Sequence, residues 1–168
     1  MPGEKFIKNV SGVLTEVVST QVGGGGGADK IPSLNSSGKL DVTMMPTGIA
    51  ADTETVTASE ALAAGDFVNV YNNAGTAAVR KADATVAGKE ANGFVLAAVL
   101  NAGQATVYME GANTQITGMT PGPMYLSTTP GLGTNTPPSA SGNIVQRIGI
   151  AVSATRMNLQ TVSPFTLA

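Results

Sequence analysis

The sequence predicts an all-β protein, a compact jelly-roll-like sandwich or barrel preceded by an N-terminal β-hairpin arm and an extended connector. Short β-branched segments recur in the C-terminal two thirds of the chain at spacings of roughly 8 to 12 residues, separated by Gly, Pro and Asn. No segment has a long apolar stripe at helical spacing. A run of glycines, Gly23 to Gly27, divides an N-terminal segment with its own β pattern from the rest.

These features indicate three parts. We expect an arm over residues 1–22, a Gly-rich tether and extended connector over residues 23–50, and a β body over residues 51–168. Glycines have no side chains to pack and sample positive φ freely, so the run predicts a flexible tether with a reach of about 17 Å. A mobile arm on a folded body favours attachment over catalysis.

The arm itself predicts a hairpin. Residues 5–10 and 13–18 are rich in β-branched and aromatic side chains, and they flank the turn dipeptide Ser11-Gly12. An isolated hairpin is only marginally stable in water, so it needs a surface to pack on, either a partner or the chain's own body. The candidate partner-binding residues are Phe6, Ile7, Val10, Val13, Leu14 and Val17.

The connector has apolar positions that follow neither the strand nor the helix period, and Pro32 and Pro46 oppose both structures. We expect an extended segment with a turn at Ser36-Ser37-Gly38. Its apolar side chains are too numerous for a solvated loop, so they are expected to contact neighbouring subunits or the chain's own body. The candidate oligomer-interface residues are Ile31, Leu34, Leu40, Met44 and Met45.

The body is expected to contain a series of short strands. They cover residues 53–57, 67–71, 76–80, 93–100, 105–110, 124–127, 143–153 and 155–162. The clearest hairpin joins residues 93–100 to residues 105–110. Residues 128–142 are rich in Pro, Gly and Thr and predict an exposed loop.

The composition argues against catalysis. The chain has no His, Cys or Trp, and only 12% of its residues are charged against a typical share of about 25%. The missing His excludes the common serine triad, and the missing Cys excludes disulfides and cysteine-based metal sites. The glycine run lacks the Gly-Lys-Ser/Thr of a phosphate loop, and the carboxylates have no calcium-loop spacing. We expect no catalytic residues, no cofactor and no metal.

The charge pattern also limits the partners. A net charge of −2 without a basic cluster argues against direct contact with nucleic acid. The longest apolar run, Phe94 to Leu100, is too short to cross a bilayer, and the first residues do not read as a secretion signal. We expect a soluble protein made in a cytoplasm. Its neutral surface, rich in Thr, Ser, Asn and Ala, favours packing into an assembly.

Several stretches resemble the capsid decoration (cement or head-fibre) proteins of tailed bacteriophages. They are Phe6-Ile7-Lys8-Asn9-Val10-Ser11-Gly12-Val13-Leu14-Thr15-Glu16, Lys30-Ile31-Pro32-Ser33-Leu34, Ser37-Gly38-Lys39-Leu40-Asp41, Met44-Met45-Pro46-Thr47-Gly48-Ile49, Ala91-Asn92-Gly93-Phe94-Val95 and Gly122-Pro123-Met124-Tyr125-Leu126-Ser127. The resemblance covers most of the chain, and its motifs are structural.

The resemblance implies a homotrimer on the outer surface of the capsid in the virion, made in the bacterial host cytoplasm. Its N-terminal segment is then expected to contact the major capsid protein, with no direct contact to nucleic acid or membrane. A competing hypothesis is a trimeric fibre or adhesin module in which the loop over residues 128–141 binds a host-surface glycan.

Overall fold

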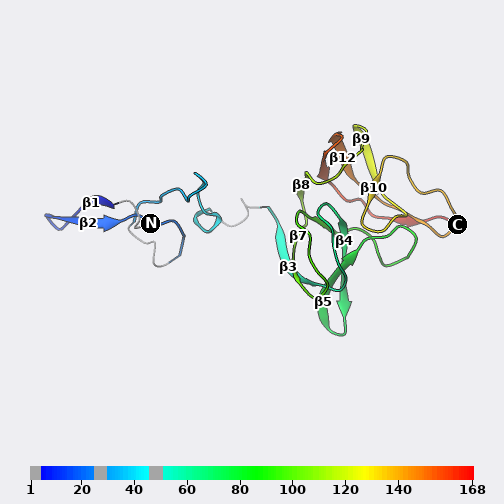
Figure 1. Ribbon diagram of the computed structural model, residues 1–168, viewed down its shortest axis with the longest axis horizontal. Coiled ribbons are helices and arrows are strands. Elements are labelled where there is room, and N and C mark those ends of the chain that lie inside the picture. The colour runs from blue at the N-terminus through cyan, green and yellow to red at the C-terminus, as the bar shows by residue number, and fades with distance from the viewer. Residues whose placement is uncertain (1–4, 25–29, 46–50) are drawn as a thin grey trace. The chain divides into compact units, whose positions relative to one another are not determined.

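The structure, a computed structural model, describes residues 5–24, 30–45 and 51–168. Its contacts divide the chain into two compact units, Met1–Ala50 and Ala51–Ala168, which we call the N-terminal unit and the body (Figure 1). Strands are the main regular structure in both units, and the predicted all-β class is confirmed. The one helical element among the described residues is a short 3-10 turn, η2 (Val42–Met44).

The N-terminal unit begins with the predicted hairpin. Strands β1 (Lys5–Val10) and β2 (Val13–Val18) pair antiparallel along their full length. Ser11 and Gly12 between them have φ values of 52° and 89°, and two successive positive values define the I′ turn that suits the twist of a hairpin. The Asn9 Oδ1 atom accepts a hydrogen bond of 2.8 Å from the Gly12 N–H and fixes this turn.

The hairpin base is bonded to the connector. Thr20 forms a parallel bridge with Pro32: its N–H donates to the Ile31 carbonyl at 3.1 Å, and its carbonyl accepts from the Ser33 N–H at 2.8 Å. The Gly23 N–H donates to Thr43 Oγ1 at 2.7 Å. Gly23, the first residue of the predicted tether, is thus bonded to the connector, while residues 25–27 lie outside the described part.

The body contains a closed barrel of five strands. They are β3 (Thr53–Ala58), β4 (Phe67–Asn73), β5 (Thr76–Lys81), β6 (Gly93–Val95) and β7 (Gln104–Tyr108), in the order β3-β5-β4-β6-β7. The β3–β5 pair is parallel and short, and the other pairs are antiparallel. Small side chains fill the narrow interior, as the tight curvature of a five-stranded barrel requires: Val56, Ala58, Leu62, Val68, Val79, Val95, Ala105 and Val107.

A five-stranded antiparallel sheet completes the body. It consists of β8 (Gly111–Asn113), β9 (Gly122–Leu126), β10 (Gly133–Thr134), β12 (Arg147–Ser153) and β13 (Arg156–Leu159), in the order β10-β9-β12-β13-β8. Strands β11 (Ile144–Val145) and β14 (Phe165–Thr166) form a separate pair. Figure 1 shows β9, β10 and β12 gathered on one side of the body and the barrel strands β3, β4, β5 and β7 on the other.

A second core joins the sheet to the outside of the barrel. Barrel residues Phe67 and Phe94 pack in one buried cluster with Met124, Ile148 and Met157 of the sheet. The Phe94 ring also stacks on Tyr108, with centroids 5.4 Å apart. The body therefore has two apolar cores, one inside the barrel and one between barrel and sheet.

Three strand predictions need correction. The strand expected over residues 93–100 ends at Val95, and beyond it Val99 forms only an isolated bridge with Leu62. The strand expected over residues 143–153 is interrupted at Gln146, between β11 and β12. The loop expected over residues 128–142 contains β10.

Candidate docking surface

The hairpin presents two different faces. Directly opposed residues share a face, so the pairs Phe6/Val17 and Val10/Val13 lie together on what we call the valine face (Phe6, Val10, Val13 and Val17). The alternate positions form the leucine face (Ile7, Leu14 and Val18). The leucine face also carries Asn9 and an ion pair between the Lys5 ammonium and the Glu16 carboxylate.

Apolar side chains are exposed on both faces. Ile7 is 63% exposed, Val13 65% and Leu14 73%, whereas Phe6 and Val17 are half-buried. No side chain that the structure describes in the N-terminal unit is buried. All six predicted arm residues are therefore brought together on one small hairpin that has no core beneath it.

The connector adds further exposed apolar side chains. Ile31 is 53% exposed, Leu34 57% and Met45 42%, while Leu40 and Met44 are half-buried. The predicted oligomer-interface residues thus lie in the same compact unit as the predicted partner-binding residues. The sequence did not predict that the arm and the connector share one unit. The hydrogen bonds that join them around Thr20 are between backbone groups, and the side-chain pattern does not indicate such bonds.

A capping residue orders the end of the connector. The Asp41 carboxylate accepts hydrogen bonds from the Thr43 hydroxyl at 2.5 Å and from the Thr43 N–H at 3.0 Å, at the start of η2. These bonds, the hydroxyl one foremost, lower the pKa of Asp41. Since Thr43 Oγ1 also accepts from Gly23, the cap ties the connector to the segment that follows the hairpin.

One ion pair of the body has a buried carboxylate. Asp66 is 4% exposed; its Oδ2 atom accepts from the Ala63 N–H at 2.8 Å and lies 3.7 Å from Lys81 Nζ. Burial raises the pKa of Asp66, and the bond from Ala63 and the charge of Lys81 oppose that rise. No group of three or more His, Cys, Asp or Glu residues in the described ranges could hold a metal ion. The hydrogen bond and the ion pair of Asp66 therefore have a structural role.

Other buried polar side chains of the body are also hydrogen-bonded. The Gln146 amide donates to the Ala91 carbonyl at 2.9 Å and accepts from the Ala91 N–H at 2.7 Å. Asn69 accepts from Arg80 Nε at 3.0 Å, and the Arg80 guanidinium lies 4.1 Å from the centre of the Tyr71 ring. The sequence analysis did not predict these hydrogen bonds. Asn69 is a polar residue within the apolar run of β4, and a buried polar side chain at such a position is expected to have a hydrogen-bond partner.

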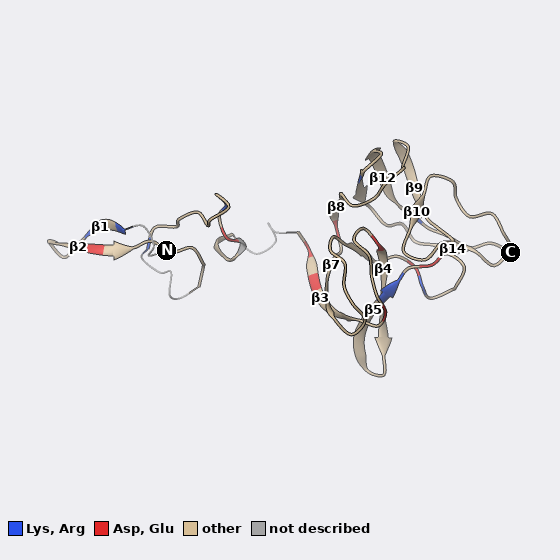
Figure 2. Ribbon diagram, in the orientation of Figure 1, with Lys and Arg blue, Asp and Glu red and all other residues tan. Residues whose placement is uncertain are grey.

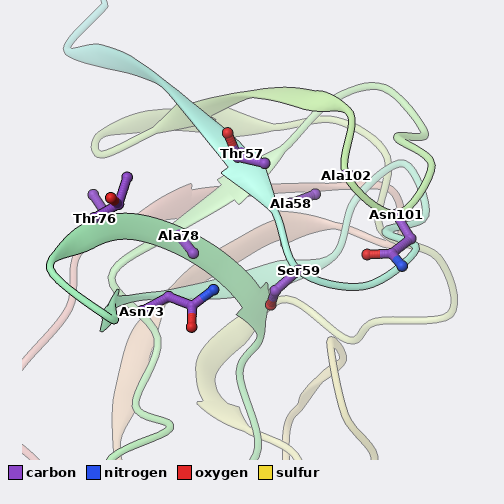
Figure 3. A pocket seen from close by; sticks show the side chains of 9 residues that line it. Thr57, Ala58, Ser59, Asn73, Thr76, Ala78, Asn101 and Ala102 are labelled. Atoms are coloured by element: carbon purple, nitrogen blue, oxygen red, sulfur yellow. The ribbon is translucent and has the colours of Figure 1, made fainter.

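A hollow of about 370 Å³ lies on the barrel wall. Figure 3 shows the side chains that line it. Its polar side chains come from three segments, with Thr57 and Ser59 at the end of β3, Asn73 and Thr76 around the β4–β5 turn, and Asn101 after β6. No charged or nucleophilic pair lines it, so the hollow offers only neutral hydrogen bonds.

A second hollow of about 340 Å³ lies in the loop that the glycan hypothesis singled out. Its lining includes the hydroxyl groups of Thr128, Thr134, Thr136 and Ser139 and the amide of Asn143, with two prolines. These groups can donate and accept hydrogen bonds, but no aromatic ring lines the hollow.

The body surface carries few charges, and Figure 2 shows most of its ribbon without Lys, Arg, Asp or Glu. Across the described ranges, no helix combines the length and the apolar character needed to cross a bilayer. No protein-family model, curated protein or solved structure matches this chain. Its function has to be argued from its own residues.

Proposed function

We propose that this chain is a structural protein of a tailed-phage virion that binds the outer surface of the capsid. It stabilises the shell by bridging subunits of the major capsid protein, acts as a homotrimer without catalysis, cofactor or metal, and is made in the host cytoplasm. It contacts neither nucleic acid nor membrane directly.

The observation that carries this proposal is the exposed apolar surface of the N-terminal unit. Ile7, Val13 and Leu14 are each more than 60% exposed on a hairpin that has no core of its own. Full burial of such a side chain contributes roughly 1.5 to 3 kcal/mol. A hairpin of this kind is therefore better suited to holding a partner than to standing alone in water.

An oligomer strengthens attachment through linked binding. Once one arm binds the shell, the others act at a high local concentration, so weak single contacts add up to firm attachment. A ligand that binds only the assembled shell stabilises that shell by mass action. The connector residues Ile31, Leu34, Leu40, Met44 and Met45 supply apolar surface for the contacts between copies.

Deletion of residues 1–22 tests the role of the arm. The body contains both apolar cores, so the truncated protein is expected to fold and to lose its binding to empty capsids in a sedimentation assay. The full chain, with a matched melting profile for the body, is the control. Binding retained by the truncated protein would place the anchor in the body and reject this assignment.

The fibre or adhesin function remains a second candidate because of the hollow lined by Thr128, Thr134, Thr136 and Ser139. Copy number and position on purified virions separate the two. Hundreds of copies over the head support decoration, whereas a few tens at the tail support a fibre. Binding of a glycan array by the isolated protein, abolished by Thr136→Val, would favour the adhesin.

A further inference from the structure

An amine and two carboxyl groups meet where β4 and β5 lie side by side, and the proposed function uses none of them. Lys81 is the last residue of β5 and pairs with Val68, while Asp66 immediately precedes β4. The Lys81 Nζ atom lies 3.7 Å from Asp66 Oδ2. The Glu60 Oε1 atom accepts a hydrogen bond of 2.9 Å from the Lys81 backbone N–H, and the charge of Glu60 acts on the Asp66 carboxyl.

The Asp66 carboxyl is enclosed but has few partners. Among the described residues, the one contact of hydrogen-bond length to it comes from the Ala63 N–H, since 3.7 Å to Lys81 is too long. Gly131 closes one side, because a Cβ at this position would lie 2.7 Å from Asp66 Oδ1. A buried charge with few partners is costly, and burial raises the pKa of Asp66. Enclosure therefore favours the neutral pair, in which a proton has moved from the Lys81 amine to the Asp66 carboxyl.

We propose that Lys81 and Asp66 condense to form an isopeptide bond, with Glu60 as the proton carrier. The neutral Lys81 amine attacks Asp66 Cγ, so that an Nζ–Cγ bond forms and the bond from Cγ to one carboxyl oxygen breaks. That oxygen leaves as water, with the carboxyl proton and one amine proton. Glu60 takes the amine proton, passes it to the leaving oxygen and ends unchanged. The reaction occurs once in each chain, and it is independent of capsid binding.

The fold supplies what this condensation requires. Holding the two groups together makes the reaction unimolecular, and an enclosed site excludes the water that would favour hydrolysis. The ion pair between Lys5 and Glu16 in the hairpin has proximity without enclosure, since both side chains are 55% exposed. The Asp66 side chain, by contrast, is only 6% exposed. We therefore expect the bond at Lys81 and Asp66 and none between Lys5 and Glu16.

The bond links the two ends of the β4–β5 hairpin, which forms part of the barrel wall. Figure 2 shows basic residues at the end of β5, where the link lies. A covalent link restricts the unfolded chain, as a disulfide does, and this chain has no cysteine. The link therefore stabilises the barrel. Titration of Asp66 belongs to the chain before the bond forms, because an amide has no acidic proton in the range of a carboxyl group.

Intact-mass spectrometry of the full chain tests the proposal. After incubation at neutral pH, the wild type is expected to weigh less than its sequence by the mass of one water. Digestion and tandem mass spectrometry should then give a branched peptide that joins the segment of Lys81 to that of Asp66. A wild type that keeps its full mass after prolonged incubation, or a link between Lys5 and Glu16 instead, would overturn the proposal.

Two conservative variants separate the chemistry from the fold. Lys81→Arg keeps the positive charge beside Asp66, but a guanidinium stays protonated and does not attack, so this variant should keep its full mass. Glu60→Gln keeps an acceptor for the Lys81 N–H but cannot carry the proton, so water loss should be at least about tenfold slower. The melting transition of the body checks that both variants are folded.

The variants also define the results that contradict the assignment. Water loss that persists in Lys81→Arg would come from another site and would overturn the isopeptide bond. Water loss at an unchanged rate in folded Glu60→Gln would overturn the role of Glu60 as proton carrier. Neither result depends on whether the protein binds capsids, so this inference and the proposed function fail or stand separately.

Discussion

The two units of this chain use β structure in opposite ways. The body places its large apolar side chains inside, with Phe67, Phe94, Met124 and Ile148 at most 1% exposed. The N-terminal unit places them outside, with Ile7 and Leu14 more than 60% exposed. Strands rich in apolar residues therefore enclose a buried core in one unit and leave an exposed apolar surface in the other.

The difference arises from strand number and closure. A barrel has no free edge, and the sheet that packs on it covers the barrel's apolar outer side. A two-stranded hairpin has two free edges and two faces, and it cannot cover either face by itself. Stability in the body and recognition in the N-terminal unit should respond to different substitutions.

The largest expected effect comes from Phe94→Ala. The Phe94 side chain is fully buried between barrel and sheet and stacks on Tyr108, so its removal should lower the free energy of unfolding by about 3 to 5 kcal/mol. Chemical denaturation of the full chain measures the loss. The matched control is Leu14→Ala, which should leave the unfolding transition of the body within about 0.5 kcal/mol. Equal losses would contradict the separation of the two units.

Gln146→Met ranks second. The side-chain volume is nearly kept, but the Ala91 N–H and carbonyl lose their partners inside the body. Each of the two unpaired buried groups costs about 1 to 3 kcal/mol, so we expect a total loss of about 2 to 6 kcal/mol. The same denaturation measurement applies, with Gln104→Met on the exposed side of β7 as control. A loss no larger than in the control would show that water replaces the lost bonds.

The sequence predicts best the elements whose causes are local. The hairpin follows from Ser11-Gly12 between two alternating segments, and β3, β4 and β5 follow from β-branched residues around a turn with Gly75. These elements need only neighbours a few residues away. The exposure of Ile7 and Leu14 also follows from composition, since a small hairpin has no interior.

The missed features depend on contacts between distant residues. The run Gly93 to Leu100 leaves the sheet after Val95 because Val99 exchanges hydrogen bonds with Leu62 instead. Gln146 interrupts a strand because its side chain reaches Ala91, 55 residues away. Strand β10 is only two residues long, and it is a strand because it pairs with β9. Apolar pattern alone cannot identify which distant backbone offers a partner.

The pH dependence of stability gives the third prediction. Burial raises the pKa of Asp66 above the ordinary value of 3.8, so the folded body binds this proton more tightly than the unfolded chain does. The stabilising contribution of protonated Asp66 is therefore full below pH 3.8 and is lost as the pH rises through the folded pKa.

Asp66→Asn removes this titration but keeps an acceptor for the Ala63 N–H. The stability of the wild type relative to the variant should fall as the pH rises from below 3.8, as measured by urea midpoints at several pH values. Lys81 and Glu60 act on the same carboxyl, and both side chains are kept in the variant. A difference that does not change with pH would contradict the role of burial.

The smallest expected effect lies in the hairpin turn. Asn9→Ala removes the acceptor of the Gly12 N–H, an exposed hydrogen bond worth about 0.5 to 1 kcal/mol. A change of that size is invisible in the unfolding of the body, but it changes the population of a marginal hairpin several-fold. Cross-strand nuclear Overhauser effects between Phe6 and Val17 should weaken in the variant, and binding to capsids should fall in parallel if a preformed hairpin is what docks. If the cross-strand contacts weaken but binding is unchanged, the hairpin forms only when the arm binds its partner. The docking surface would then exist only in the complex, and the body would be the one unit that folds without a partner.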